Sequence, residues 1–253
     1  MPALLVLAAA CGGDGGAKLR VFAASSLTEA FTDIAAGFEA ENPGITVQLD
    51  LGGSQRLRSQ LEFGAKADVF ASADQLQMDQ AAALGLTAGA AVDFASNSLV
   101  VIASPGGAVR GLPDLAKPGV TLALAQSNVP VGSYTRQALR NLANDASLGL
   151  GNGFDAGVLS NVVSEEPNVR IVAQKVALGE VDAGIVYSTD VPAARTTGDV
   201  RVIDIPPGAN VSARYPIAAL RDASEPGLAQ DFIAFVLSEA GQRTLSGYGF
   251  GSP

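Results

Sequence analysis

The sequence predicts an α/β protein made of two lobes. Short apolar runs rich in Val and Ile alternate with segments of helical period, which is the pattern of α/β units around a mainly parallel sheet. This alternation is interrupted after "NSLVVIASPGG" at 97–107 and starts again at "VTLALAQ" at 120–126. A chain of 253 residues can hold two modest lobes, because domains commonly run to about 100–150 residues.

The first α/β section alternates strands and helices in order. Leu27, Phe31, Ile34 and Phe38 share one face of its first helix, which should stop before Pro43. The expected strands are "KLRVFAA" at 18–24, "ITVQLDLG" at 45–52 and "ADVFASA" at 67–73, and the expected helices are "LTEAFTDIAAGFEAENP" at 27–43, "SQRLRSQLEFGA" at 54–65 and "DQLQMDQAAALG" at 74–85.

The second section restarts the pattern and ends in an extended passage, 200–220, which Pro206-Pro207-Gly208 interrupts. The tail at 225–250 has the pattern of an amphipathic helix with a short end. The expected elements between are the strands 120–126 and 182–190 and the helices 133–144 and 168–179. Extended passages between two α/β sections indicate more than one crossing. We therefore assign 18–96 plus 213–253 to lobe 1 and 97–212 to lobe 2, with crossings near 97–103 and 205–214.

The composition excludes several functions. A formal net charge of −9 argues against nucleic acid, because phosphate binding depends largely on Lys and Arg. The chain has no histidine, and Cys11 is its one cysteine, which rules out Ser-His-Asp and Cys-His catalysis, His or Cys zinc sites and an internal disulfide. "GGDGGAK" lacks the spacing of a phosphate-binding loop. We expect neither an enzyme nor a cofactor.

The first 17 residues differ from the rest. "MPALLVLAAAC" is apolar, ends in small residues and is followed by a polar, glycine-rich tether. It is too short to span a bilayer, which needs about 20 residues. It resembles the end of a lipoprotein signal peptide, in which Cys11 would carry the lipid; an incidental free cysteine is the alternative.

Two serines stand where a strand gives way to a helix. In "FAASSLTEAF" at 22–31, Ser26 is suited to be an N-cap, and Glu29 three residues later would complete a capping box. In "LGGSQRLRSQL", two glycines allow close backbone approach before Ser54. Either serine could simply cap its helix, or its hydroxyl could help to hold an anion at the helix N-terminus.

Each of three further stretches allows either a purely structural or a functional interpretation. The loop in "AQSNVPVGSY" could turn its N–H groups to a ligand or be an ordinary turn. "EEPNVRIV" opens a helix with acids in the first turn and Pro167 at or near its start. "DAGIVYSTD" ends on Tyr187, whose hydroxyl needs a partner if it is buried.

Together these stretches resemble one family. "FAASSLTEAF", "GGSQRLRSQLEFGAKADVFASAD", "NSLVVIA", "VPVGSY" and "GEVDAGIVYSTD" occur in the order found in the periplasmic molybdate-binding proteins of ABC importers, over nearly the whole chain after residue 18. The resemblance implies the two-lobed periplasmic-binding-protein (type II) fold, with hinge-connected α/β domains and a ligand cleft between them.

The resemblance also implies a set of ligand contacts. The two serines of the family correspond to Ser26 and Ser54, and the tyrosine to Tyr187. Backbone N–H donors correspond to Val131, where alanine is usual, and to Val169. No side chain would bind molybdenum directly. Such a set suits a tetrahedral dianion with no proton, because that ligand needs donors only. Glu29 would compete for the Ser26 N–H, so we expect it to turn outward.

The function implied is capture of molybdate, and of tungstate, by a monomeric protein held on the outer face of the membrane by a lipid anchor. The protein would deliver the oxyanion to a permease driven by a cytoplasmic ATPase. A binding protein for another oxyanion, such as sulfate or thiosulfate, is the closest alternative. A sensory ligand domain and a transferase with the same two-lobed fold are more distant ones.

Overall fold

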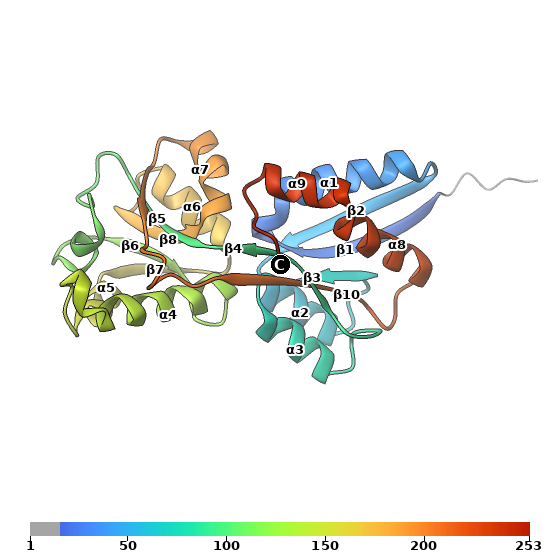
Figure 1. The fold of residues 1–253 in the computed structure, drawn as a ribbon, viewed down its shortest axis with the longest axis horizontal. Helices are drawn as coiled ribbons and strands as arrows, with labels where there is room; N and C mark the ends of the chain where they lie inside the picture. The colour runs from blue at the N-terminus through green and yellow to red at the C-terminus, as the bar shows by residue number, and fades with distance from the viewer. Residues whose placement is uncertain (1–15) are drawn as a thin grey trace, which may run out of the picture.

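The computed structural model of the protein describes residues 16–253, so Cys11 lies outside the described residues. Within them, the strands form two five-stranded sheets with helices on both faces (Figure 1). This confirms the α/β fold with two lobes. Below, lobe 1 denotes the sheet that contains the first strand together with its helices, and lobe 2 denotes the other sheet with its helices.

Lobe 1 has the strand order β2-β1-β3-β10-β4, in which β1 pairs in parallel with β2 and β3 while β10 runs antiparallel to β3 and β4. Helices α1, α8 and α9 cover one face and α2 and α3 the other (Figure 1). The elements are β1 (Ala17–Ala24), α1 (Thr28–Glu41), β2 (Ile45–Gly52), α2 (Ser54–Glu62), β3 (Val69–Ala71), α3 (Gln75–Ala83), β4 (Val92–Asn97), β10 (Ala213–Ala219), α8 (Pro226–Leu237) and α9 (Glu239–Gly247).

Lobe 2 has the strand order β7-β6-β8-β5-β9. Strands β5 and β8 are buried along their whole length, which explains why both read as continuous apolar runs rather than as alternating ones. The elements are β5 (Leu99–Ala103), β6 (Leu122–Ala125), α4 (Pro130–Asn144), α5 (Phe154–Ser160), β7 (Val162–Glu166), α6 (Val169–Ala177), β8 (Ala183–Tyr187), α7 (Val191–Thr197) and β9 (Arg201–Asp204).

The chain passes between the lobes twice. It leaves lobe 1 at Ser98, between β4 and β5, and returns through 205–212, between β9 and β10. The two passages lie side by side, because β4 and β10 pair antiparallel with Asn97 opposite Ala213 (Figure 1). The Asn210 side chain ties them further, accepting from the Leu99 N–H at 3.1 Å and donating to its carbonyl at 2.8 Å. The passages therefore form a double-stranded hinge.

Several sequence expectations are wrong in detail. Glu165 and Glu166 end the edge strand β7 instead of opening a helix, and α6 begins after Asn168, whose side chain accepts from the Ile171 N–H. The tail is two helices, because Ser238 ends α8 and its hydroxyl caps α9. Strands β4 and β7 and helices α5 and α7 were not expected. Among residues 16–253, no helix is both long and apolar enough to cross a membrane.

Candidate functional site

One small cavity between the lobes, with a free volume of about 10 Å³, contains all the contacts expected from the sequence. Ser26, Ser54, Val131, Val169 and Tyr187 all line it, and each is at most 3% exposed. The other lining residues are Ala24, Ser25, Gly52, Gly53, Ala73, Val129 and Pro130. The fold thus brings five positions that are distant in sequence into one buried space.

Lobe 1 contributes two hydroxyls from neighbouring strand ends. Strands β1 and β2 are parallel and end together at Ala24 and Gly52, so the residues that follow, Ser26 and Ser54, emerge at the same edge of the sheet. A Cβ added at Gly53 would lie 2.5 Å from the Pro167 carbonyl oxygen of lobe 2. The glycine is required there because the two backbones approach closely.

Ser26 is not a helix cap, which corrects the capping-box expectation. It lies in a single 3-10 turn, Ser25–Leu27, and α1 begins only at Thr28, with no side-chain cap at its start. The extra turn separates Ser26 from the free N–H groups of α1. Its Oγ instead lies 3.0 Å from the Oη of Tyr215 on β10.

Ser54 is not a cap either. It is the first residue of α2, whose N-cap is Gly53. Its Oγ accepts a hydrogen bond from the Ala73 N–H at 3.0 Å. Among the described residues no acceptor is found for the Ser54 hydroxyl hydrogen, so this hydrogen is available to the cavity.

Lobe 2 contributes the starts of two helices. Val131 follows Pro130, the first residue of α4, and Val169 is the first residue of α6. N–H groups in the first turn of a helix have no partner inside it and carry the positive end of the helix dipole. Both positions therefore offer backbone donors, while both side chains are buried in the core.

Tyr187 ends β8 at the cavity. Within residues 16–253 its buried hydroxyl has no hydrogen-bond partner, so the partner that a buried tyrosine needs is not supplied by the described part of the protein. Burial raises the pKa of Tyr187 well above its ordinary value, so the hydroxyl keeps its proton. A buried polar group without a partner is costly, and this one lies where a ligand oxygen could accept its hydrogen.

Arg170 joins the lobes beside the cavity. From α6, its Nε donates to the Ser25 carbonyl of lobe 1 at 3.0 Å and lies 3.1 Å from Asp190 Oδ1. Its terminal nitrogens pair with Glu29 on α1. Glu29 leaves the Ser26 N–H free, as expected, but it faces Arg170 across the cleft instead of pointing outward.

A second contact between the lobes lies near α2. The Gln55 Nε2 donates to the Pro167 carbonyl at 2.8 Å. Together with Arg170 and the burial of the lining residues, this contact shows that the two lobes meet around the cavity.

The chemistry of the lining is one-sided. No Lys, Arg, Asp or Glu lines the cavity among the described residues, whereas hydroxyls and helix-start N–H groups converge on it. Asp190, the acid of lobe 2 that faces Arg170, is fully buried, and burial raises its pKa to about 6. Such a site can hold a small anion by hydrogen bonds alone.

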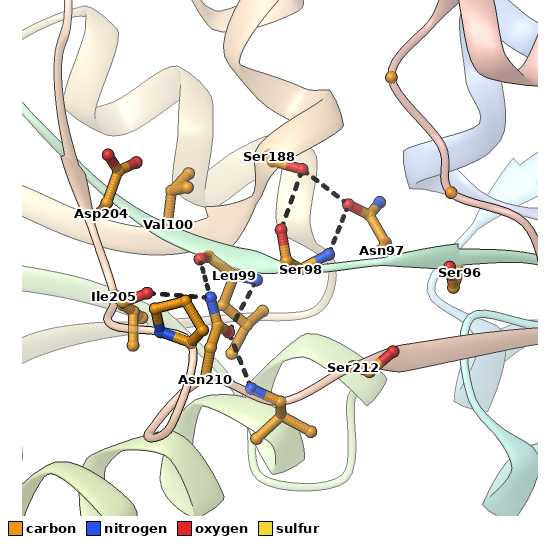
Figure 2. Close-up of a pocket in the computed structure, with 14 residues that line it drawn as sticks. Ser96, Asn97, Ser98, Leu99, Val100, Ser188, Asp204, Ile205, Asn210 and Ser212 are labelled. Atoms are coloured by element: carbon orange, nitrogen blue, oxygen red, sulfur yellow. Dashed lines mark hydrogen bonds between the residues drawn. The ribbon is translucent and has the colours of Figure 1, made fainter.

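Sequence reasoning missed Arg170, Tyr215 and Asn97. An arginine in the first turn of a helix opposes the helix dipole, so Arg170 gave a local signal of a tertiary role. A larger groove of about 660 Å³ runs along the hinge and includes Asn97, Ser188 and Asn210 (Figure 2). It contains none of the five expected residues, so we take the smaller cavity as the site.

Two α/β lobes closed over a small, donor-lined cavity define a binding protein for a small solute. The family model described as "Bacterial extracellular solute-binding protein" matches residues 19–251. The chain belongs to this family. It is a solute-binding protein and not an enzyme, and its ligand is cargo instead of a cofactor.

Named relatives agree with the resemblance seen in the sequence. The molybdate-binding protein ModA of Mycobacterium tuberculosis is 42% identical over 242 residues, which cover 95% of this chain and 87% of the relative. The periplasmic molybdate-binding protein of Azotobacter vinelandii superposes with a TM-score of 0.77 at 21% identity, covering 93% of this chain and 99% of that one. The sulfate-binding protein SubI of M. tuberculosis superposes with a TM-score of 0.81 at 16% identity, covering 92% of this chain and 86% of that one. The resemblance is confirmed, while the two structural likenesses show the fold alone.

Proposed function

We propose that this protein captures molybdate, and tungstate, outside the cytoplasm and delivers it to an ABC importer. The observation that carries the proposal is the convergence of Ser26, Ser54, Val131, Val169 and Tyr187 on one cavity, to whose lining residues 16–253 contribute no charged side chain. The 42% identity to a molybdate-binding protein over 95% of the chain supports the choice of ligand.

The donor set suits a tetrahedral dianion. Hydrogen bonds to a charged group contribute roughly 1.5–3 kcal/mol each, so three hydroxyls and two backbone N–H groups together offset a large desolvation cost. Molybdate and tungstate carry no proton near neutral pH and need only donors. Hydrogen phosphate carries a proton and would also need an acceptor.

Size would separate molybdate from sulfate. Oxygens on molybdenum or tungsten stand farther from the central atom than oxygens on sulfur, so a fixed ring of donors fits one class better. A binding protein for sulfate or thiosulfate uses the same chemistry and is the alternative to exclude.

Titration calorimetry with molybdate, tungstate, sulfate, thiosulfate and phosphate tests the ligand. We expect molybdate and tungstate to bind tightly and at least a hundredfold better than the other three. Equal affinity for sulfate and molybdate would overturn the assignment. X-ray scattering should show a smaller radius of gyration on binding, since the contacts come from both lobes; an unchanged profile at saturation would contradict closure of a hinge.

The membrane attachment is a separate part of the proposal. Cys11 would carry a lipid, and the protein would act as a monomer that docks on a permease driven by a cytoplasmic ATPase. Replacing Cys11 by Ser should move the protein from the membrane fraction to the soluble one. Retention of the variant in the membrane fraction would exclude the lipid anchor.

A further inference from the structure

We propose that Asn97 and Tyr215 act as positioning residues that point the Ser26 hydroxyl hydrogen into the cavity and so select against oxyanions that carry a proton. This inference rests on the proposed function of the cavity as an oxyanion site. It concerns two residues of lobe 1 that do not line the cavity: Asn97 ends β4, next to the hinge, and Tyr215 lies in β10.

The orientation of the Asn97 amide is fixed by a backbone group. The Ser98 N–H donates to Asn97 Oδ1 at 2.9 Å, and a backbone N–H can only donate. The Ser188 hydroxyl donates to the same oxygen at 3.0 Å, as Figure 2 shows. The amide nitrogen must therefore face the other way, toward Thr189 Oγ1 at 2.8 Å and Tyr215 Oη at 3.3 Å.

The Asn97 amide in turn fixes the Tyr215 hydroxyl. Because Asn97 donates to Tyr215 Oη, the tyrosine oxygen acts as the acceptor in that contact. Tyr215 is fully buried, and burial raises its pKa far above the ordinary value, so the hydroxyl keeps its hydrogen. Among the described residues, the remaining partner of Tyr215 Oη is Ser26 Oγ at 3.0 Å. A buried donor needs an acceptor, so Tyr215 donates to Ser26.

The hydroxyl hydrogen of Ser26 then has no acceptor among the described residues and is directed into the cavity. Its Oγ accepts from Tyr215, and within residues 16–253 it has no other hydrogen-bond partner. Ser26 lines the cavity, so its hydrogen points to the space a ligand would fill. Ser54 has the same arrangement, since its Oγ accepts from the Ala73 N–H. Each serine oxygen has a second lone pair, but accepting from a ligand with it would leave the serine's own hydrogen without a partner among residues 16–253. Both serines therefore meet a ligand as donors.

The expected consequence is selectivity by protonation state. Molybdate accepts hydrogen bonds on every oxygen, so two committed donors stabilise it. Hydrogen phosphate presents one O–H that must find an acceptor, and an unmatched polar group in a buried site costs about 1–3 kcal/mol. The Tyr215 hydroxyl thus increases the preference for molybdate over hydrogen phosphate without contacting the ligand.

A double-mutant cycle tests the link. Tyr215→Phe keeps a ring that packs against Phe94, Tyr187 and Phe250 and removes the hydroxyl. We expect it to weaken molybdate about tenfold, the equivalent of one hydrogen bond, and to lower the ratio of molybdate to phosphate affinity. In a Ser26→Ala background the same change should alter molybdate affinity less than about twofold, because Tyr215 acts through Ser26.

Tyr248→Phe is the matched control. Its hydroxyl donates to Asp33 at 2.6 Å, away from the cavity, so its loss should leave both affinities unchanged. Equal losses from Tyr215→Phe in the wild-type and Ser26→Ala backgrounds, or an unaltered ratio of molybdate to phosphate, would overturn the inference. A wild-type protein that does not bind molybdate would instead overturn the proposed function.

Asn97→Asp provides a second route if Tyr215→Phe fails to fold. A carboxylate only accepts, so Tyr215 would donate to it, and the Tyr215 oxygen would then compete with the ligand for the Ser26 hydrogen. The same substitution in the Ser26→Ala background measures the direct effect of the added charge. We expect the loss of molybdate affinity to be larger by about tenfold with Ser26 present; equal losses would overturn the inference.

Discussion

The two lobes face the same cavity with different kinds of donor. Lobe 1 presents the hydroxyls of Ser26 and Ser54, each held through its oxygen by another group of the protein. Lobe 2 presents backbone N–H groups at Val131 and Val169, together with the Tyr187 hydroxyl, which has no protein partner in the described part of the chain. Binding through lobe 1 should therefore be sensitive to replacement of the serine side chains. Binding through the backbone donors of lobe 2 should depend on where the helices begin and little on which side chains they carry.

The largest expected effect comes from the serines of lobe 1. Ser26→Ala and Ser54→Ala should each weaken molybdate about ten- to a hundredfold, since each removes a hydrogen bond worth roughly 1.5–3 kcal/mol to a charged ligand. Ser54→Ala should also lower the free energy of unfolding by about 1–3 kcal/mol, because the buried Ala73 N–H loses its acceptor.

Calorimetry and urea unfolding measure the two quantities separately. Ser160→Ala is a suitable control, because this exposed serine bonds only the Gly157 carbonyl on its own helix. Serine variants that bind molybdate like the wild type would show that the lobe 1 hydroxyls are not ligand contacts.

Tyr187→Phe should weaken molybdate about tenfold, at the lower end of the serine range, by removing one donor. Its effect on the ligand-free protein should differ from that of Ser54→Ala. The Tyr187 hydroxyl has no partner within residues 16–253, so its removal should leave the free energy of unfolding unchanged or raise it. A clear loss of stability together with unchanged binding would assign Tyr187 a structural role.

Each lobe also buries one acid near the cavity, and the pair predicts a pH dependence. Burial raises the pKa of Asp74 and of Asp190 from 3.8 to about 6. The folded state then binds more protons than the unfolded state between about pH 4 and 6, so stability should fall as the pH rises through this window.

Asparagine substitutions at these acids sharpen the comparison. Asp74 caps α3, a role that asparagine also fills, whereas Asp190 faces Arg170. Asp74→Asn should flatten the slope between pH 4 and 6 and stabilise the protein near pH 7. Asp190→Asn should also flatten the slope of stability against pH, but it should stabilise the protein less near pH 7, because Arg170 loses a partner. Urea midpoints that do not move with pH in the wild type would contradict both expectations.

The smallest effect is expected at the backbone donors. Val131→Ala and Val169→Ala keep the N–H groups, so molybdate affinity should change less than about threefold. Each should cost about 1.6 kcal/mol of stability, from about 0.8 kcal/mol per buried methyl group. Val158→Ala, a buried valine outside the cavity, should cost the same. A tenfold loss of affinity at either cavity position would mean that the side chain contributes directly.

The sequence was sufficient to predict which residues lie at the strand ends. It was insufficient to predict the long-range contacts that hold those residues in place. Ser54 follows the alternating strand β2 and its two glycines, and Tyr187 ends the apolar strand β8, so their place at the sheet edge was predictable. Tyr215 lies 189 residues from Ser26, and Arg170 lies 141 residues from Glu29, so no local pattern reveals these contacts. The edge strand β7, "VVSEE", is half-exposed and lacks a continuous apolar run, which is why it was missed.

The bridge from Arg170 to Ser25 and Glu29 bears on how fast a captured ion can escape. For an ion held among the proposed contact residues, each at most 3% exposed, breaking this bridge and parting the lobes would set the dissociation rate. A long residence time would then protect the cargo during diffusion. A protein that receives the ion would speed its release by separating the two lobes, without competing for the ion itself.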